Sequence, residues 1–582
     1  MTTFLGVDVG GTFTDAVLVA DGRLRTAKVP TSARQEDSVV AAARAVGAAD
    51  VERFTHGTTV ATNALLERKG ARTALVATDG FEHVLHLRRQ TRAHLYRLCV
   101  DHPEPLVPLE RCVGVRERMA PDGVLSPLEL ESIPALDADA VAVCLLHSYR
   151  WPEHEQAVAA ELRRRLPHAH VVASHEVAPE FREYERASTT TADAYLGPVV
   201  GRYLRALETA AGAAGLPEPL VMRSSGGVAS LGEAAEHAAF VLVSGPAGGA
   251  VGAARVAVES GHPNAIALDM GGTSTDVCLI LDGEVGRSSE RVVGGLPIRL
   301  PSVDLHTVGA GGGSIARVDA GGALRVGPES SGAFPGPACY GRGGELPTVT
   351  DANLALGRLP RRLAGGLELD SDAAERSLEG IDPRGVVDVV NAEMLRALRV
   401  VSVERGHDPR EFALVAFGGA GPLHACELAD ELDMRTVLVP EAAGVLSALG
   451  LVASDERRDH VETRLVPLAE AGELPAEGDA DLRYRGQSFE LTVALGPDLA
   501  DRFHRAHEDR YGYADRSRPI ELVALRRADV RPAPELRLPR AEPIQVSGPA
   551  VLEQAGSTVW VPPGWVGVRD GDGPSTLKLT KA

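Results

Sequence analysis

The 582-residue chain contains very little lysine, cysteine or aromatic side chain. Only four of its 60 basic residues are lysine, and none of them lies in a G-x-x-x-x-G-K-[ST] sequence, which excludes P-loop nucleotide chemistry. The sequences H-E-x-x-H and G-x-S-x-G are absent too, so no zinc protease or nucleophile-elbow hydrolase of those types is indicated. The six cysteines are scattered without a C-x-x-C pair, which is typical of buried thiols in a reducing compartment.

Positive charge and long apolar runs are also scarce. The formal net charge is −20 and the pI about 5.4, which argues against a nucleic-acid-binding surface and against an anionic membrane surface. The most apolar stretch, 238–254, contains Pro246 and four glycines, which is typical of a loop packed inside a protein and not of a membrane span. The N-terminus lacks the basic and apolar regions of a signal peptide. We therefore expect a cytoplasmic protein with neither nucleic acid nor membrane as a partner.

Two segments of the chain resemble each other at a constant offset of 261 residues. Residues 5–22 read LGVDVGGTFTDAVLVADG and residues 267–283 read ALDMGGTSTDVCLILDG. Apolar runs flank a Gly-Gly pair in both, so each copy is predicted to be a strand, a tight turn and a strand. The repeat matches Asp8 with Asp269, Gly10 with Gly271, Gly11 with Gly272, Thr12 with Thr273, Thr14 with Thr275, Asp15 with Asp276 and Asp21 with Asp282.

These turns have the residues of a phosphate site. Glycine permits a positive φ and lets a ligand approach the backbone, where successive N–H groups form an anion-binding concavity, and threonine hydroxyls add donors. Asp8 and Asp269 would repel phosphate directly, but they are well placed to hold a hydrated Mg²⁺ that contacts it. One such hairpin alone is explained as well by an ordinary glycine-rich turn. Two copies favour two similar lobes that face one nucleotide.

A third glycine-rich turn follows an apolar strand at 412–417. It reads Gly418-Gly419-Ala420-Gly421-Pro422 and leads into a predicted helix, in whose first turn Pro422 is well accommodated. Its glycines would let a purine or an α-phosphate lie against the backbone. Taken alone this pattern is weak, because strand–glycine–helix turns are common packing devices.

Together these motifs resemble the superfamily of actin, hexokinase and the heat-shock chaperone ATPases. More narrowly, the chain resembles the A subunit of the hydantoinase/oxoprolinase family over essentially its whole length. That resemblance rests on numerous motifs, among them GVDVGGTFTDAVL (6–18), HGTTVATNALLERKG (56–70), SGPAGG (244–249), ALDMGGTSTDV (267–277), VDLHTVGAGGGSIA (303–316), GPACYGRGG (336–344) and FGGAGPLHACELA (417–429).

The resemblance implies an α/β fold with two duplicated ribonuclease-H-like lobes, an inserted module and a small C-terminal β-rich module. We expect the first lobe with its insertion at 1–195, the second lobe at 196–455 and the C-terminal module at 456–582. It also implies an enzyme that uses ATP and Mg²⁺ to open a cyclic amide such as a hydantoin, 5-oxoproline or another lactam. The carbonyl oxygen would be phosphorylated first, and a separate B-type subunit would take part in hydrolysis.

Three alternatives remain open at this point. The first is the ATP-using subunit of an acetone-type carboxylase, and the second is a free-standing small-molecule kinase. The third, a nucleotide switch without catalysis, would bind ATP and turn it over slowly whether or not a substrate is present.

By the same resemblance, the two hairpins and the later turn would surround the nucleotide. The expected phosphate contacts are Gly10, Gly11, Thr12 and Thr14 on one side, Gly271, Gly272, Thr273, Ser274 and Thr275 on the other, and Gly418, Gly419 and Gly421 near the adenosine. The catalytic candidates are Asp8, Asp269, Asp15 and His56, with Asp8 and Asp269 as the Mg²⁺ ligands. Asp15, like Asp276, either orients a nucleophile or braces its turn. His56 either meets the substrate or is a hydrogen-bonded packing residue.

Other polar pairs have two interpretations each. Asp304 and His306 alternate on a predicted strand and share a face, where they would bind a metal or align a substrate or nucleotide. The following loop, 309–314, either wraps phosphate or is a close-packed turn. His504 and His507 share one face of a predicted helix, which favours packing over ligation.

Overall fold

The first lobe is built on a sheet that begins with the N-terminal hairpin. In the computed structural model, which describes residues 3–582 except 21–22, 364–366, 535–541, 555 and 571–574, β1 (Phe4–Val9) pairs antiparallel with β2 (Phe13–Ala20), and β2 with β3 (Arg23–Pro30). On its other side β1 lies parallel to β4 (Arg53–Thr58), which lies parallel to β10 (Leu220–Met222). The resulting order is β3-β2-β1-β4-β10.

The second lobe repeats this arrangement. Its strands are β12 (Ala265–Met270), β13 (Thr275–Leu281), β14 (Glu284–Val285), β22 (Ala413–Phe417) and β23 (Thr436–Pro440). They lie in the order β14-β13-β12-β22-β23, with the first three antiparallel and the last two parallel to β12. Sequence order, direction and spatial order therefore match between the lobes. The predicted duplicated, ribonuclease-H-like α/β fold is confirmed.

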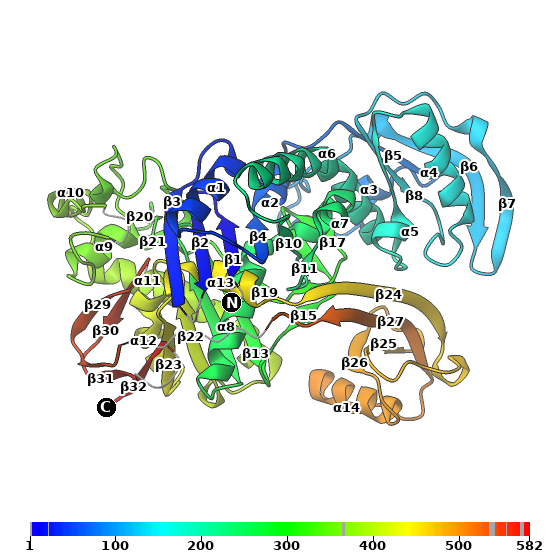
Figure 1. Cartoon of the computed structure of the whole chain (residues 1–582). Coiled ribbons are helices and arrows are strands. Elements are labelled where there is room, and N and C mark those ends of the chain that lie inside the picture. Colours follow the sequence, from blue (N-terminus) through cyan, green and yellow to red (C-terminus); the bar gives the residue numbers. More distant parts are fainter. Residues whose placement is uncertain (1–2, 21–22, 364–366, 535–541, 555, 571–574) are drawn as a thin grey trace.

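Two helices, α8 (Ser244–Glu259) and α13 (Leu446–Ala453), cross between the sheets (Figure 1). A Cβ atom on Gly450 would lie 1.8 Å from the Gly248 carbonyl oxygen, and one on Gly6 would lie 2.2 Å from that of Ala448. Only glycine permits these approaches. The prediction of a loop at 238–254 was wrong from Ser244 onward, where α8 begins. The glycines allow the helices to cross, and Pro246 lies in the first turn of α8, where a helix needs no N–H donor.

An α/β module is inserted into the first lobe. It has a sheet in the order β7-β6-β5-β8-β9 and lies at one end of the molecule (Figure 1). The strands are β5 (Thr73–Thr78), β6 (Cys112–Ala120), β7 (Gly123–Glu129), β8 (Ala140–Cys144) and β9 (His170–Ala173), with α4 (Glu153–Arg165) beside β9. The 31-residue helix α6 (Glu183–Ala213) follows and connects this module to the rest of the lobe.

The C-terminal region is rich in β-strands, which are divided between the sheets of the two lobes. Strands β24 (Glu456–Pro467), β27 (Ile520–Arg531), β25 (Asp479–Tyr484) and β26 (Leu491–Ala494) extend the first sheet through β11 (Val228–Ala229), with α14 (Leu499–Tyr511) beside them. Strands β32 (Thr576–Lys581), β31 (Trp565–Arg569) and β28 (Ile544–Ser547) extend the second sheet beyond β23. Within the described residues, no helix is long and apolar enough to cross a membrane.

Candidate active site

The two Gly-Gly turns have the same local geometry. In β1–β2, Asp8 lies opposite Asp15 and Val9 opposite Thr14, and in β12–β13 Asp269 lies opposite Asp276 and Met270 opposite Thr275. The Gly10 N–H donates to the Phe13 carbonyl at 2.9 Å, and the Gly271 N–H donates to the Ser274 carbonyl at 3.0 Å. Gly11 and Gly272 lie at exposed tips with open space around them. Each turn therefore presents bare backbone that a ligand can approach.

The carboxylates of Asp8 and Asp269 lie against other glycines. A Cβ atom on Gly57 in β4 would come within 2.4 Å of Asp8 Oδ1, and one on Gly245 in the first turn of α8 within 3.4 Å. On the other lobe, a Cβ atom on Gly418 would lie 2.3 Å from Asp269 Oδ1. Glycine at these positions keeps room for the two carboxylates, and neither Gly57 nor Gly245 was recognised from the sequence as part of the site.

Burial and neighbouring carboxylates perturb the carboxyl groups of both Asp8 and Asp269. Burial and the charge of Asp15 raise the pKa of Asp8 to about 7, although Lys28 opposes the shift. Burial raises the pKa of Asp269 to about 8, and the charges of Asp276 and Asp8 add to the effect. Asp8 and Asp269 belong to different lobes, and the charge of Asp8 adds to the raised pKa of Asp269, so the two carboxyl groups lie within electrostatic range of each other.

The donor set fits a hydrated divalent cation. Asp8 Oδ1 is buried and has no hydrogen-bond partner. Nowhere in the described ranges do three or more His, Cys, Asp or Glu side chains gather to enclose a metal. Mg²⁺ does not need such a cage, because it is commonly held by one or two carboxylates together with water and substrate phosphates. The orphaned oxygen and the two repelling carboxyl groups are therefore compatible with Mg²⁺.

The second aspartate of each hairpin has a partner on the neighbouring strand. Lys28 in β3 donates to Asp15 Oδ1 at 2.5 Å, directly across the strand pair. Thr307 in β19 (Leu305–Val308) donates to Asp276 at 2.5 Å. Both hydrogen bonds hold the hairpin in place. They favour the bracing role for Asp15 and Asp276 over the role of orienting a nucleophile. Lys28 is one of only four lysines in the chain, and this rarity was the signal that could have drawn attention to it.

Two threonines expected at the phosphates point elsewhere. Thr14 and Thr275 are fully buried. The Thr14 hydroxyl bonds that of Thr31 at 3.0 Å, and Thr275 donates to the Ala310 carbonyl at 2.6 Å. Side chains alternate along a strand, and these two share the core face with Ala16 and Val277, respectively. The predicted phosphate contacts that remain at the hairpins are Gly10, Gly11, Thr12, Gly271, Gly272, Thr273 and Ser274.

The loop at 309–314 lies directly on the second hairpin turn. The N–H groups of Gly312 and Gly313 donate to the carbonyls of Gly271 and Gly272 at 3.0 and 2.7 Å. A Cβ atom on Gly311 would lie 2.6 Å from the Thr273 nitrogen. Two of its donors are thus used within the protein, which favours the close-packed interpretation over a phosphate-wrapping loop.

The third glycine-rich turn lies beside the second hairpin, between β22 and α12 (Gly421–Glu431). Gly418 has φ +80°, and its N–H donates to the Ala443 carbonyl. Gly419 is exposed with open space where a side chain would be, whereas Gly421 is buried at the start of the helix. Only Gly419 therefore has the open approach expected of an adenosine contact.

His56 does not enter this cleft. His56 pairs with Val7 in the β1–β4 pair, and Val7 directly precedes Asp8. Because side chains alternate along a strand, His56 and Asp8 point to opposite faces of the sheet. Nδ1 bonds the Val7 carbonyl at 3.1 Å and Nε2 bonds the Tyr203 hydroxyl of α6 at 2.8 Å. Burial lowers its pKa to about 4, so the ring is neutral. Both nitrogens are occupied, and the catalytic role expected for His56 gives way to the packing alternative.

The remaining polar pairs also have partners. Asp304 forms an ion pair with Arg405, and no metal cluster includes Asp304 or His306 in the part of the chain that is described. His504 bonds the Tyr484 hydroxyl at 2.7 Å, and His507 bonds Gln487 and the Tyr513 carbonyl. The two histidines therefore pack α14 against its sheet, as expected.

Comparison with known proteins identifies the family. Residues 4–166 match the hydantoinase/oxoprolinase N-terminal region, and residues 186–460 match the hydantoinase/oxoprolinase family pattern. The chain belongs to the hydantoinase/oxoprolinase family. It is 35% identical to the caprolactamase subunit alpha of Pseudomonas jessenii, over 96% of this chain and 97% of that one. It is 34% identical to the acetophenone carboxylase gamma subunit of Aromatoleum aromaticum, over 80% of this chain and 70% of that one.

Solved structures agree with this assignment. The ATP-dependent caprolactamase of Pseudomonas jessenii superimposes with a TM-score of 0.86 at 33% identity, with all of both chains covered. Acetone carboxylase without nucleotide shares the fold with a TM-score of 0.79 at 24% identity, again over both whole chains. The chain is also 38% identical to 5-oxoprolinase 1 of Arabidopsis thaliana, but it covers only 36% of that longer protein.

Proposed function

We propose that this protein is the ATP-dependent subunit of a cyclic-amide hydrolase, which phosphorylates the amide carbonyl oxygen of a hydantoin, 5-oxoproline or other lactam. The observation that carries the proposal is the pair Asp8 and Asp269, which lie at matching positions of the two duplicated glycine-rich hairpins and both have a raised pKa. The likeness to an ATP-dependent caprolactamase over the whole chain supports cyclic amides as the substrate class.

Resonance makes the carbonyl carbon of a ring amide a poor electrophile, and phosphorylation of the oxygen removes this obstacle to hydrolysis. The carbonyl oxygen attacks the γ-phosphorus of ATP, so that a new O–P bond forms and the bond to the ADP oxygen breaks. The product is an imidate phosphate, whose carbon is a far better electrophile than that of the ring amide. Water adds to this carbon, the ring C–N bond breaks, and the nitrogen leaves with a proton. A second water then releases phosphate and leaves a carboxylate.

The protein supplies position and charge rather than a covalent intermediate. The bare backbone at Gly10, Gly11, Gly271 and Gly272 lets the phosphates come close to N–H groups, and the pairs Asp15–Lys28 and Asp276–Thr307 hold the hairpins in place. Asp8 and Asp269 would hold Mg²⁺, which neutralises phosphate charge. The helices α8 and α13 cross at glycines and so allow the lobes to lie close on either side of the nucleotide.

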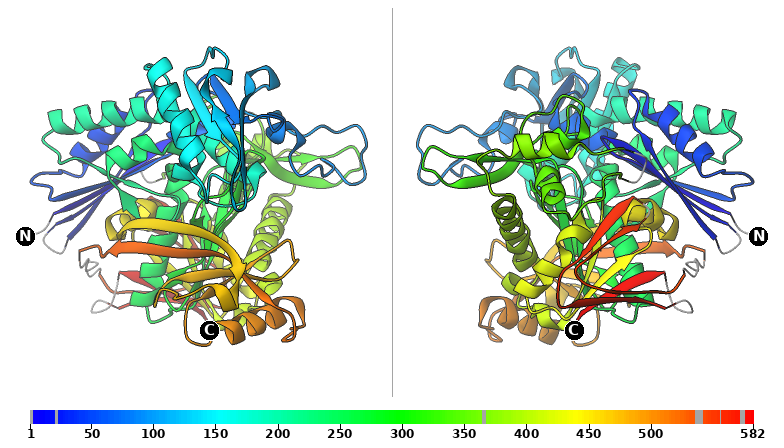
Figure 2. Two further views of the ribbon diagram at one scale, coloured as in Figure 1. Left: turned by 90° about the vertical axis from the view of Figure 1, so that its right-hand side faces the viewer. Right: turned by 90° about the vertical axis from the view of Figure 1, so that its left-hand side faces the viewer.

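A B-type partner subunit is part of the proposal. The name of the caprolactamase relative, subunit alpha, supports a second chain. The loop 89–104 supports it too, because all sixteen residues are exposed and lack regular structure. Leu95, Tyr96 and Leu98 in this loop are 72%, 91% and 85% exposed. The loop projects from the body beside a β-hairpin in Figure 2. Exposed apolar clusters of this kind are typical of protein–protein contacts.

An acetone-type carboxylase is the second candidate. The identity to the acetophenone carboxylase gamma subunit, 34%, is close to that of the caprolactamase subunit, 35%. Coverage favours the hydrolase, because the chain spans 97% of the caprolactamase subunit and 70% of the carboxylase subunit.

Phosphate release from ATP and Mg²⁺, measured over a panel of cyclic amides and ketones with and without bicarbonate, tests the proposal. The protein should be purified natively so that any B-type subunit is retained, with Asp269→Ala as the matched variant. We expect one ring to stimulate release without bicarbonate, and the variant to lose this stimulation. Stimulation by a ketone that requires bicarbonate would favour the carboxylase, and no stimulation by any ring would refute the hydrolase.

A further inference from the structure

Neither glycine-rich hairpin carries a basic side chain in its turn. Residues 8–15 read DVGGTFTD and residues 269–276 read DMGGTSTD, so the hairpins bring four aspartates to the place where the phosphates of ATP would lie. Phosphoryl transfer depends on positive charge at the phosphate oxygens, and Mg²⁺ is one source of it. A lysine or arginine from another strand would be a second source.

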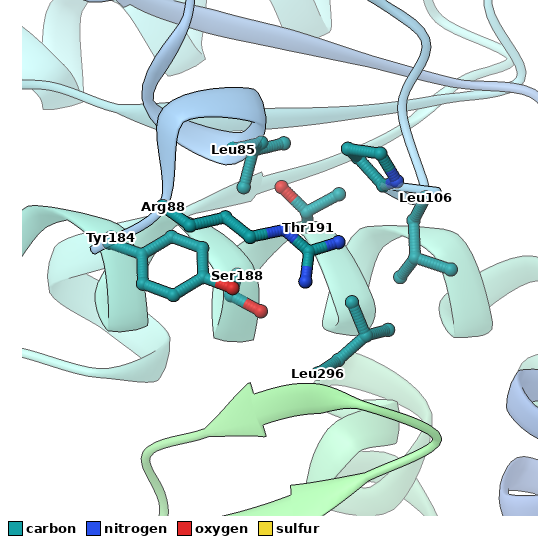
Figure 3. Close-up of a pocket in the computed structure, with 8 residues that line it drawn as sticks. Leu85, Arg88, Leu106, Tyr184, Ser188, Thr191 and Leu296 are labelled. Atoms are coloured by element: carbon teal, nitrogen blue, oxygen red, sulfur yellow. The ribbon is translucent and has the colours of Figure 1, made fainter. Parts of the chain in front are cut away.

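Arg88 does not reach this place. It extends across a void beside α6 whose walls include Leu85 and Leu296 (Figure 3). The void has room for about one water molecule, and the two leucines belong to the same core as Val7. Asp8 follows Val7 on β1 and points to the other face of the sheet, so the charge of Arg88 is on the wrong side for the phosphates.

Lys28 of β3 lies in register with the aspartates of the first hairpin. Asp8 pairs with Asp15 across β1 and β2, and Asp15 pairs with Lys28 across β2 and β3, so the three side chains leave the same face of the sheet. Leu24, four residues earlier on β3, packs on this face against the core that contains α8, α13 and the strands of the second lobe. Lys28 therefore faces the second lobe.

The ammonium group of Lys28 lies close to the first turn and within electrostatic range of both lobes. Nζ is 2.5 Å from Asp15 Oδ1 and 5.4 Å from the centre of the Phe13 ring, and Phe13 directly follows the turn. Neighbouring strands are about 5 Å apart, so a charge held at Asp15 is roughly one strand spacing from Asp8. The charge of Lys28 opposes the raised pKa of Asp8 and also that of Asp269 in the second lobe.

The stem of Lys28 lies at the junction between the lobes. A Cβ atom on Gly556 of the C-terminal module would lie 3.3 Å from Lys28 Cε, and one on Gly444 would lie 2.3 Å from the Gly556 carbonyl oxygen. The carbonyl of the neighbouring Ala443 accepts the N–H of Gly418, which begins the third glycine-rich turn. Close contacts thus lead from Lys28 to the turn where we expect the adenosine.

Lys28 also has donors that the protein does not use. An ammonium group has three N–H donors, and Asp15 is its one hydrogen-bond partner within the described residues. The side chain is 24% exposed, so two donors remain open to a ligand in the cleft. A cation that is fixed by one carboxylate beside a turn of bare backbone suits a charge-assisted hydrogen bond to phosphate.

We propose that Lys28 binds the γ-phosphate of ATP, donating to one of its oxygens while it keeps its hydrogen bond to Asp15. The inference deepens the proposed function and rests on it for ATP as the ligand. When the ring carbonyl oxygen bonds to the γ-phosphorus and the ADP oxygen leaves with the bonding electron pair, Lys28 stays protonated and stabilises the charge on the transferred group. The alternative is that Lys28 only braces the hairpin through Asp15.

Nucleotide affinity tests this contact without any ring substrate. Isothermal titration calorimetry with Mg²⁺ should compare a non-hydrolysable ATP analogue with ADP, which lacks the γ-phosphate. We expect Lys28→Met to weaken the affinity for the ATP analogue at least about tenfold and the affinity for ADP less than about threefold. Arg25→Met is the matched control, because Arg25 is a cation on the opposite face of the same strand, and it should change neither affinity.

Two further variants separate phosphate binding from bracing. Lys28→Gln keeps an N–H donor for Asp15 but removes the charge, so we expect it to lose affinity for the ATP analogue as Lys28→Met does. It also remains informative if Lys28→Met fails to fold. Asp15→Asn removes the carboxylate and leaves the ammonium group. If Lys28 acts only through Asp15, Lys28→Met has no further effect in the Asp15→Asn background, whereas we expect a further loss of at least about fivefold.

Unchanged affinity for the ATP analogue in Lys28→Met, an equal loss for ADP, or wild-type affinity in Lys28→Gln would overturn the proposal. These results are distinct from failure of the proposed function. That failure is read from ring-stimulated phosphate release, whereas the affinities are measured with no ring present.

Discussion

Replacing Asp269 by asparagine should make the metal-free protein more stable while it destroys activity. The carboxyl group has a pKa of about 8 in the folded protein against an ordinary value of 3.8. The unfolded chain therefore gives up this proton near pH 4, whereas the folded chain keeps it until about pH 8. A group with a raised pKa contributes its full stability below the unfolded pKa. This contribution decreases as the pH rises from the unfolded to the folded pKa, and above the folded pKa it no longer changes with pH.

The size of the effect follows from the shift. Each pH unit inside the window lowers the free energy of unfolding by about 1.4 kcal/mol, so the wild type loses about 3 kcal/mol between pH 6 and pH 8. Asparagine cannot ionise, so the variant does not lose this free energy. The side chain is partly open to solvent, so we expect about half of this. For a chain of 582 residues, the melting temperature of Asp269→Asn should then exceed that of the wild type by about 1 °C more at pH 9 than at pH 6.

Differential scanning calorimetry in EDTA, from pH 6 to pH 9, measures this difference. Asp282→Asn makes the same change on the exposed turn after β13 and serves as the control. Phosphate release by Asp269→Asn should fall at least about 100-fold. An advantage for Asp269→Asn that does not grow with pH, or a variant less stable than the wild type at pH 9, would refute the electrostatic reasoning for this site.

Three further predictions concern other parts of the protein. His56→Phe should lower the free energy of unfolding by about 2 kcal/mol, because two buried hydrogen bonds are lost, yet change kcat less than about threefold; a large fall in kcat at unchanged stability would contradict this. Calorimetric Mg²⁺ affinity should rise at least about tenfold from pH 6 to pH 8, because the cation displaces protons from the two facing carboxyl groups; an affinity independent of pH would count against them as ligands. The double change Leu95→Ser and Tyr96→Ser should weaken binding of the B-type subunit at least about tenfold, whereas Val124→Ser with Leu125→Ser, two other exposed apolar residues on β7, should not.

The hairpins and the two-lobed fold could be predicted because their signal is local and repeated. Asp8, Gly10 and Gly11 recur as Asp269, Gly271 and Gly272, and a turn that needs bare backbone leaves this trace in any sequence. The strand order is then the same in both lobes, because each copy begins an antiparallel pair to which parallel strands are added.

The orientation of single side chains could not be predicted in the same way. Thr14, the second residue of β2, and Thr275, the first of β13, point to the core face. Side chains alternate between the two faces of a strand, so a shift of one residue would have turned them toward the turn. His56 depends on Tyr203, which lies 147 residues further on. Helix α8 could not be predicted, because its glycines are typical of a loop. They are needed for the close crossing with α13.

If ATP activates the ring amide, each ring that is opened consumes one ATP. The ratio of opened ring to released phosphate tests this most directly. Ring opening and phosphate release should be measured together, with the natively purified protein and the ring that stimulates it. We predict one phosphate for each ring opened, no ring opening without ATP, and neither product from Asp269→Asn. Ring opening that proceeds without ATP, or phosphate release that Asp269→Asn leaves unchanged, would contradict the account.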